Sequence, residues 1–349
     1  MKKFLAILMC AMMLVGVAAC AKTPAPAAEE PAAAEAAPAP AADEPAATTG
    51  GTIYVLGPTP DHGWTAQAGT YAEKKVAAIN EEGQYKAVYM AASTGEEQVD
   101  QVQTILANGD AVGVVFFALE DAAKAGQEAL IAANVPFISF DRIIEGPDKY
   151  SILNASGDNW QCGAGIAYWL QKNGMAPGAT LVTLIGDNGT VCGRRQEGFE
   201  QFLRGEIEYF DQDKNESYKT TEVWTQEQLD ALTADYKVVC NWSADGAYQY
   251  LEQKLPEIVS KAKTTGGNLF VYAMDDEMTF GLMNLLEANA IDEATKADFA
   301  ALNVYTSAIG GMAELYAVID GTSAQAPTAQ TYFDGLMYVP MSSRQNIAR

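Results

Sequence analysis

Short apolar runs alternate with amphipathic stretches along most of this chain. The runs are rich in branched and aromatic residues, which is typical of buried strands, and the stretches between them repeat apolar residues at helical spacing. The predicted strands are 52–56, 85–89, 112–117, 136–140, 180–185, 236–239 and 269–273. The predicted helices begin near Trp64 and Ser93 and then span about 121–133, 160–172, 194–203, a long stretch after Ser243, and 276–287.

Local signals mark where some of these elements begin and end. Ser93 and Glu96 have the spacing of a capping box, and Asn108-Gly109 predicts the end of the helix that follows. Residues 211–232 are polar without a clear period, so this segment is expected to be mainly loop.

Strands that alternate with helices predict an α/β fold in which helices cover both faces of parallel sheets. The pattern runs once up to about residue 155 and resumes after Asp158, which predicts two Rossmann-like lobes joined by a hinge. We expect the N-terminal lobe at 51–156, completed by part of 324–349, and the C-terminal lobe at 157–323.

The N-terminus has a different character. Two lysines precede the apolar stretch 4–19, which is too short to cross a bilayer comfortably and is typical of a secretory signal. Val17-Ala18-Ala19-Cys20 resembles the bacterial lipobox, which implies a lipoprotein signal peptide at 1–20 and lipidation (palmitate) of Cys20; the alternative is an ordinary signal peptide. Residues 21–50 are mostly Ala, Pro, acidic residues and Thr, a composition typical of a disordered tether.

Composition excludes some classes of function. The 349 residues carry a formal charge of −23, so no nucleic-acid partner is expected. The single histidine and the lack of a phosphate-loop or nucleophile-elbow motif argue against an enzyme, and neither a cofactor nor a metal is expected. Cys162, Cys192 and Cys240 are an odd set without metal-ligand spacing, so we expect buried free thiols rather than one disulfide with a spare.

Polar and aromatic residues follow the predicted strands with unusual frequency. Ligands of open parallel sheets bind at the carboxyl ends of the strands, so these side chains are expected to meet there. Carboxylates accept hydrogen bonds from hydroxyls, guanidinium groups donate them, and indole faces stack on sugar rings, which together predict a polyol site. The candidate ligand-binding residues are Asp61, His62, Trp64, Asp141, Arg142, Arg195, Trp242 and Asp275.

Several candidates also fit a structural role. Asp141-Arg142 would suit a surface turn, and Trp64 would suit the core. One of Asp275 and Asp276 is expected to cap the following helix, and Asp276 is our choice because carboxylates favour that position. Trp160 and Trp169 fit a core position better than a site.

Four motifs in order resemble the ribose- and galactose-binding branch of type I periplasmic binding proteins, the receptors of sugar ABC transporters. The resemblance covers about 52–290. It rests on Ser139-Phe140-Asp141-Arg142, Gly157-Asp158-Asn159, the segment from Gly189-Thr190 to Arg195-Gln196-Glu197-Gly198-Phe199, and Tyr272-Ala273-Met274-Asp275-Asp276-Glu277-Met278.

The resemblance implies roles for individual residues. Asp141, Arg142 and Arg195 would hydrogen-bond a sugar, Asp275 stands where the family usually has an asparagine, and Trp242 matches the aromatic stacking position. His62 and Trp64 lie near the first-lobe aromatic. Three departures concern the sugar's identity and the C-terminus: Ala118-Leu119-Glu120 replaces a polar residue, 308–311 lacks the acid of the family's Phe-Asp-Gly strand end, and little room is left for a final helix.

We therefore expect an extracytoplasmic solute-binding lipoprotein, anchored by lipid to the cell membrane, that captures a monosaccharide or related sugar. Its expected partners are this small-molecule ligand, an ABC transporter permease and, through the anchor, the membrane. Two alternatives stay open: a sensor of the same fold that serves a chemoreceptor or histidine kinase, and a binder of a non-sugar ligand such as a nucleoside.

Overall fold

Five parallel strands form the first sheet of the protein, whose computed structural model describes residues 50–59 and 63–340. Their order, β2-β1-β3-β4-β5, places β1 between two neighbours that follow it in sequence. Loops diverge to the two faces of a sheet at such a switch point, and a ligand can enter there. The strands are β1 (Thr52–Pro58), β2 (Lys86–Ala92), β3 (Ala111–Phe117), β4 (Phe137–Phe140) and β5 (Asn154–Ala155).

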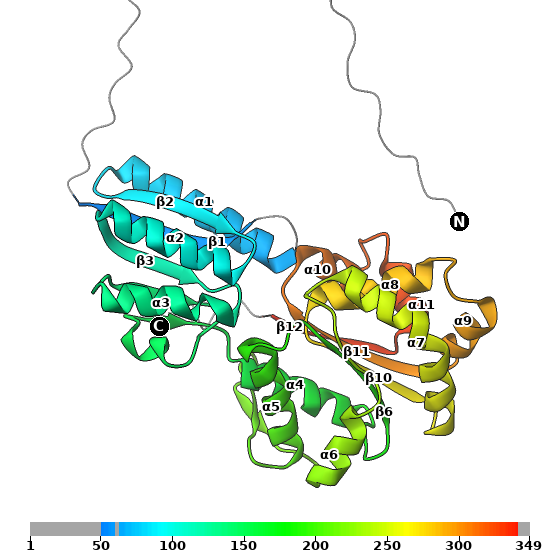
Figure 1. Ribbon diagram of the computed structural model, residues 1–349. Helices are drawn as coiled ribbons and strands as arrows, with labels where there is room; N and C mark the ends of the chain where they lie inside the picture. Colours follow the sequence, from blue (N-terminus) through cyan, green and yellow to red (C-terminus); the bar gives the residue numbers. More distant parts are fainter. Residues whose placement is uncertain (1–49, 60–62, 341–349) are drawn as a thin grey trace, which may run out of the picture. The chain divides into compact units, whose positions relative to one another are not determined.

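Three helices cover this first sheet. In Figure 1, α2 and α3 lie side by side on one face, and α1 packs against β1 and β2 from the other. Leu56, Ile105, Phe116 and Leu130 fill the space between the layers and are fully buried. The helical segments are α1 (Gly63–Glu82), α2 (Gly95–Asn108), α3 (Lys124–Ala132) and the 3-10 turns η1 (Asp121–Ala123) and η2 (Pro147–Tyr150).

A second parallel sheet repeats the plan in the order β12-β11-β10-β6-β9. Its switch point is β6, which pairs with β9 on one side and β10 on the other. All six residues of β6 are buried, as a strand covered on both faces requires. The strands are β6 (Thr180–Ile185), β9 (Lys237–Val239), β10 (Asn268–Ala273), β11 (Asn303–Gly310) and β12 (Gly335–Pro340).

Helices also cover both faces of the second sheet. Helices α4 and α5 pack together on one face, and α7 and α8 pack on the other (Figure 1). The core between the layers includes Phe199, Phe202, Phe270 and Tyr272. The helices of this lobe are α4 (Asn159–Lys172), α5 (Thr190–Leu203), α6 (Gln226–Thr233), α7 (Ala244–Thr264), α8 (Asp276–Glu287), α9 (Glu293–Ala300), α10 (Ala313–Ile319) and α11 (Ala326–Tyr332).

The structure confirms the predicted fold class: two α/β lobes follow each other along the chain, and each is built on a parallel sheet. The chain passes from the first sheet to the second between β5 and α4, near the hinge expected at 155–157. Of the segment 324–349, part of which we expect to complete the first lobe, β12 pairs with β11 in the second sheet. The remainder of that segment, 341–349, lies outside the described residues, as do 1–49 with Cys20.

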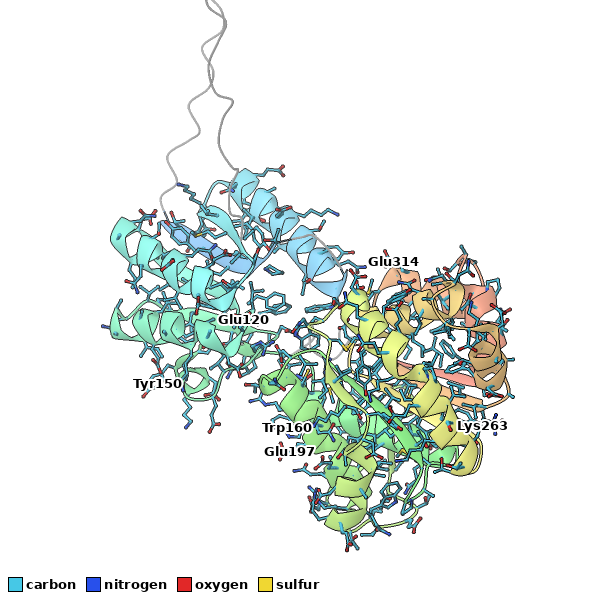
Figure 2. All side chains as sticks on the ribbon, turned by 45° about the vertical axis from the view of Figure 1, so that its right-hand side comes forward. Glu120, Tyr150, Trp160, Glu197, Lys263 and Glu314 are labelled. Atoms are coloured by element: carbon cyan, nitrogen blue, oxygen red, sulfur yellow. The ribbon has the colours of Figure 1, made fainter. Side chains whose placement is uncertain are left out.

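Three local predictions were wrong. Thr94 rather than Ser93 caps α2, because its hydroxyl accepts from the Glu97 amide at 3.1 Å. The expected loop at 211–232 contains a hairpin of β7 (Tyr209–Asp211) and β8 (Glu216–Tyr218), followed by α6, which a Thr225–Gln228 capping box begins. Trp160, expected in the core, is 37% exposed and donates to Glu197 Oε2 at 2.8 Å (Figure 2).

Other predictions of detail are confirmed. Gly109 ends α2 in the left-handed conformation, with φ of 69°, which suits glycine because it has no Cβ. Cys162, Cys192 and Cys240 are buried and, within the described part of the chain, take part in no disulfide. Among the described helices, none has the length and hydrophobicity needed to cross a bilayer.

Candidate functional site

A cavity of about 360 Å³ lies at the carboxyl ends of the strands of both sheets. Its walls come from the loops after β1, β2, β3 and β4 in the first lobe and after β6, β9 and β10 in the second. The volume is within the range of small-molecule sites. Residues with polar or aromatic side chains in its lining are Thr59, Trp64, Thr65, Ser93, Phe117, Glu120, Asp141, Arg142, Asp187, Arg195, Asn241, Trp242, Asp275 and Glu277.

Aromatic rings form the apolar part of the first-lobe wall. Trp64 stands in the first turn of α1, and its ring stacks on Phe140 at 6.4 Å with an interplanar angle of 13°. Phe117, the last residue of β3, meets Trp64 edge-on at 5.7 Å and Phe140 at 5.4 Å. The three rings hold each other in place, so Trp64 is a fixed indole surface at the cavity.

Trp242 forms the aromatic part of the second-lobe wall. It and Asn241 follow β9 in the left-handed conformation, with φ of 55° and 53°, which is strained for a tryptophan. The ring packs so closely on Gly186 that a methyl group there would overlap it. Its Nε1 donates to Asp187 Oδ2 at 3.0 Å, and the Arg195 guanidinium lies 5.6 Å from its centroid. Three contacts therefore fix this indole.

Arg195 is positioned by the packing of α5 on α4. A methyl group at Gly163 would overlap the carbonyl oxygen of Arg195, and one at Gly198 would overlap that of Trp160, so each helix needs a glycine where the other crosses it. Arg195 is 4% exposed, and its Nε donates to Asn159 Oδ1 at 2.9 Å, while Nη1 donates to the Met274 carbonyl. Asn159 belongs to α4 and Met274 follows β10, so Arg195 connects three strand ends.

Asp141 follows β4 with φ of 62°, a left-handed conformation that aspartate tolerates better than most residues. Its amide donates to the Ala155 carbonyl at 2.8 Å, which ties this turn to β5. Among the described residues, no group donates to its carboxylate. Burial raises the pKa of Asp141, while the nearby guanidinium groups of Arg195 and Arg142 act in the opposite direction.

Arg142 joins the two lobes. It is 4% exposed; Nη2 donates to Asp187 Oδ2 of the second lobe at 2.8 Å, and Nη1 donates to Asp121 Oδ1 at 3.3 Å. Asp121 in turn accepts from Thr190 N and Oγ1 of the second lobe at 3.1 and 2.7 Å. Partial desolvation acts to raise the pKa of Asp121, but hydrogen bonds from Thr190 and the charge of Arg142 hold it below its usual value. We call Arg142, Asp121, Asp187 and Thr190 the clasp.

The neighbouring acids at the start of α8 have separate roles, and our choice of the cap was wrong. Asp275 is the N-cap, because its extended backbone lets Oδ1 accept from the Glu277 amide at 3.1 Å. Asp276 is buried at 0% exposure, and its Oδ2 accepts from Gly311 and Met312 at 2.8 Å each. Burial, and then the charge of Asp276, raises the pKa of Asp275 to about 8.

The structure brings six of the predicted site residues to one cavity: Trp64, Asp141, Arg142, Arg195, Trp242 and Asp275. Asp61 and His62 lie outside the described residues. Glu120, Asp187, Asn241 and Glu277 also line the cavity, although we did not select them. Each follows or nearly follows a strand end, the same signal that identified the others. Among residues 50–59 and 63–340, no group of three or more His, Cys, Asp or Glu side chains is arranged to hold a metal ion.

Comparison with known proteins agrees with this architecture. The profile of the family described as periplasmic binding protein domain matches residues 53–333. No curated protein sequence matches the chain. Three of the solved structures that share the fold are 16–17% identical to this chain in sequence, so their similarity supports the fold alone.

The first is a carbohydrate transporter solute-binding protein from Chloroflexus aurantiacus in complex with D-glucose, with a TM-score of 0.55, 17% identity and 80% of each chain covered. The second is a Caulobacter myo-inositol binding protein, with a TM-score of 0.54, 16% identity, and 81% of this chain and 82% of that one covered. The third is the binding protein of an arabinose ABC transporter from Shewanella sp. ANA-3, with a TM-score of 0.53, 17% identity and 78% of each chain covered.

Proposed function

The chain belongs to the periplasmic binding protein domain family, and from this premise we propose that it captures a monosaccharide or related polyol in the cavity between its lobes. The observation that carries the proposal is the lining of that cavity: two fixed indole surfaces, a buried guanidinium group and several carboxylates at the ends of strands from both sheets. Hydroxyl groups donate to carboxylates and accept from a guanidinium group, and the apolar face of a sugar ring stacks on indole.

The two lobes would hold the ligand between them. Trp64 and Asp141 reach the cavity from the first lobe, and Arg195, Trp242 and Asp275 reach it from the second. A ligand that touches both sets stabilises the arrangement in which both sets are close, so binding and lobe closure would be coupled. Solved structures of the same fold contain D-glucose and myo-inositol, which supports ligands of this class and size.

We further propose that the protein works outside the cytoplasm, anchored by lipid at Cys20, and hands its ligand to an ABC transporter permease. The support is the basic and apolar N-terminus with Val17-Ala18-Ala19-Cys20, together with the transport role stated for two of the structural neighbours. Binding without turnover follows from this role, so the bound sugar should be recovered chemically unchanged.

A thermal-unfolding screen tests the proposed function. Hexoses, pentoses, furanoses, inositols and nucleosides are added singly to the mature protein at high concentration, and the midpoint is compared with that of the ligand-free protein. A ligand present at 100 times its Kd stabilises the native state by about 2.7 kcal/mol. We expect a clear upward shift with at least one sugar or inositol. A shift with nucleosides alone, or with no compound, would contradict the sugar assignment.

A further inference from the structure

The protein itself occupies five of the hydrogen-bond donors that stand at the cavity. Two of the three guanidinium nitrogens of Arg142, Nη1 and Nη2, donate to Asp121 and Asp187. Trp242 Nε1 donates to Asp187, and Arg195 directs Nε and Nη1 to Asn159 and Met274. These donors are therefore engaged before any ligand arrives.

Some of the hydrogen-bond acceptors at the cavity, in contrast, receive no donor from the described residues. The described lining includes five carboxyl groups, Glu120, Asp141, Asp187, Asp275 and Glu277, and the two guanidinium groups of Arg142 and Arg195. Because the pKa of Asp275 is raised to about 8, its carboxyl group is mostly protonated near neutral pH, and the other four carboxylates leave a formal balance of −2. The Asp141 carboxylate receives no donor from the described residues, and Glu120 accepts through Oε2 alone, from Gly95 N at 3.1 Å. Glu120, labelled in Figure 2, ends the loop after β3 and lines the same cavity as Phe117 of the aromatic wall.

A neutral sugar would leave part of this negative charge uncompensated at the cavity. Each hydroxyl group both donates and accepts, so a polyol presents as many acceptors as donors to a lining in which the protein already uses five donors. A protonated amine only donates, carries the missing positive charge, and is attracted to indole faces such as that of Trp64. Anionic sugars would meet like charge, which disfavours them strongly.

Building on the proposed function, we infer that the ligand is a cationic polyol, such as an amino sugar or an amino-inositol, whose ammonium group binds between the carboxylates of Glu120 and Asp141 and the carboxyl group of Asp275. The two lobes contribute to this subsite together, since Glu120 and Asp141 belong to the first and Asp275 to the second. Preference for the amine over the matching hydroxyl is therefore a property of the closed cavity.

Calorimetric titration with matched ligand sets tests the inference. Each set has one carbon skeleton (gluco, galacto, manno or inositol) with an amine, a hydroxyl, an acetamido or, for the sugars, a carboxylate group at the varied carbon. The experiment is done at about pH 6.5, below the ordinary pKa of an amine. In at least one set we expect the amine to bind at least tenfold more tightly than the hydroxyl and the acetamide, and the carboxylate not to bind.

Two variants test whether Glu120 causes the preference for the amine over the hydroxyl. Glu120→Gln keeps the side-chain volume and the acceptor for Gly95 N but removes one charge, so it should lower amine affinity about tenfold and lower hydroxyl affinity by a much smaller factor. Glu128→Gln, an exposed change on α3 of the same lobe, is the control and should alter neither.

The outcomes separate the inference from the proposed function. If the hydroxyl member binds as tightly as the amine in every set, the inference is overturned and the sugar-binding proposal stands. If Glu120→Gln weakens both ligands equally, the preference does not come from this subsite and the inference is likewise overturned. If no member of any set binds although the thermal screen finds a sugar, only the inference is overturned. If the screen finds no sugar either, both are overturned.

Discussion

At the scale of the residue, Asp275 is the clearest test of the electrostatics of the site. Burial and the neighbouring Asp276 raise its pKa from 3.8 to about 8. Between these values the folded protein holds a proton that the unfolded chain has released, so this residue makes the free energy of unfolding fall as pH rises from about 4 to 8. Asp275→Asn removes this titration and keeps the N-cap acceptor.

We therefore expect the melting temperature of Asp275→Asn, measured by circular dichroism without ligand, to rise above that of the wild type by a margin that widens from about pH 4.5 to pH 8.5. Asp292→Asn changes the exposed N-cap of α9 and is the control. Hydrogen bonds to Thr295 hold the pKa of Asp292 below its usual value, so Asp292 is ionised in both the folded and the unfolded chain over this pH range. The difference in melting temperature between Asp292→Asn and the wild type should therefore not change with pH. A constant difference for Asp275→Asn would contradict the buried, protonated state.

Sequence patterns placed most of the cavity residues because parallel strands end at one edge of their sheet. Asp141, Arg195 and Trp242 were identified in this way. The prediction that Asp276 rather than Asp275 caps α8 was wrong. In sequence the two neighbouring acids look alike, and what separates them is the direction of the side chain, which depends on the backbone dihedral angles and on the distant amides of Gly311 and Met312. Glu120 was noted only as a departure from the family, and its acceptor role depends on the charge balance of the folded cavity.

At the scale of the element, the α4–α5 crossing decides where Arg195 stands. Gly163→Ala would place a methyl group on the Arg195 carbonyl oxygen. We expect a loss of about 3 kcal/mol in the free energy of unfolding, the size of an overpacking defect, together with weaker ligand binding. Urea denaturation measures the first effect, and titration with the ligand found in the screen measures the second.

Gly193→Ala is the matched control on α5, because beyond the adjacent residues and the backbone of its own helix nothing lies within 4 Å of the added methyl group. It should stabilise the protein by about 0.5–1 kcal/mol through helix propensity, with unchanged binding. Equal effects of the two substitutions would show that the crossing does not set the position of Arg195.

The long elements were predictable because their apolar periods repeat over several turns or fill a whole buried strand, as in β6 and α7. The segment from β7 to α6 was not, because its strands have three residues each and α6 has eight, too few for a clear period. What holds these elements is tertiary contact, such as Gln161 Nε2 donating to the Glu208 carbonyl and Gln161 Oε1 accepting from Phe210 N.

At the scale of the whole molecule, the clasp connects lobe closure with affinity. Asp121 does not line the cavity, yet its carboxylate receives Arg142 from its own lobe and Thr190 from the other. Asp121→Ala should therefore increase the fraction of open forms. Because only the closed fraction binds, ligand affinity should fall several-fold, although Asp121 itself does not line the cavity. Small-angle scattering should show a larger radius of gyration for the ligand-free variant than for Glu128→Ala, an exposed change in the same lobe. An unchanged radius and affinity would show that the clasp does not favour closure.

The two-lobe plan followed from the repeated strand and helix pattern alone, but the pairing of the last described strand did not. β12 joins the second sheet beside β11, and sequence order gives no information about which sheet a late strand enters. The clasp was not predicted either, because Arg142 was selected as a ligand-binding residue and Asp187 was not selected, and only the fold places their side chains 2.8 Å apart.

The central claim is that the cavity between the lobes binds the sugar. The most direct measurement is calorimetric titration of the ligand found in the screen into Asp141→Ala, Trp242→Ala and the control Trp160→Ala, whose tryptophan lies on α4 and does not line the cavity. We predict at least a hundredfold loss of affinity for Asp141→Ala and Trp242→Ala and a change within about threefold for Trp160→Ala. Wild-type affinity in both cavity variants would contradict the account.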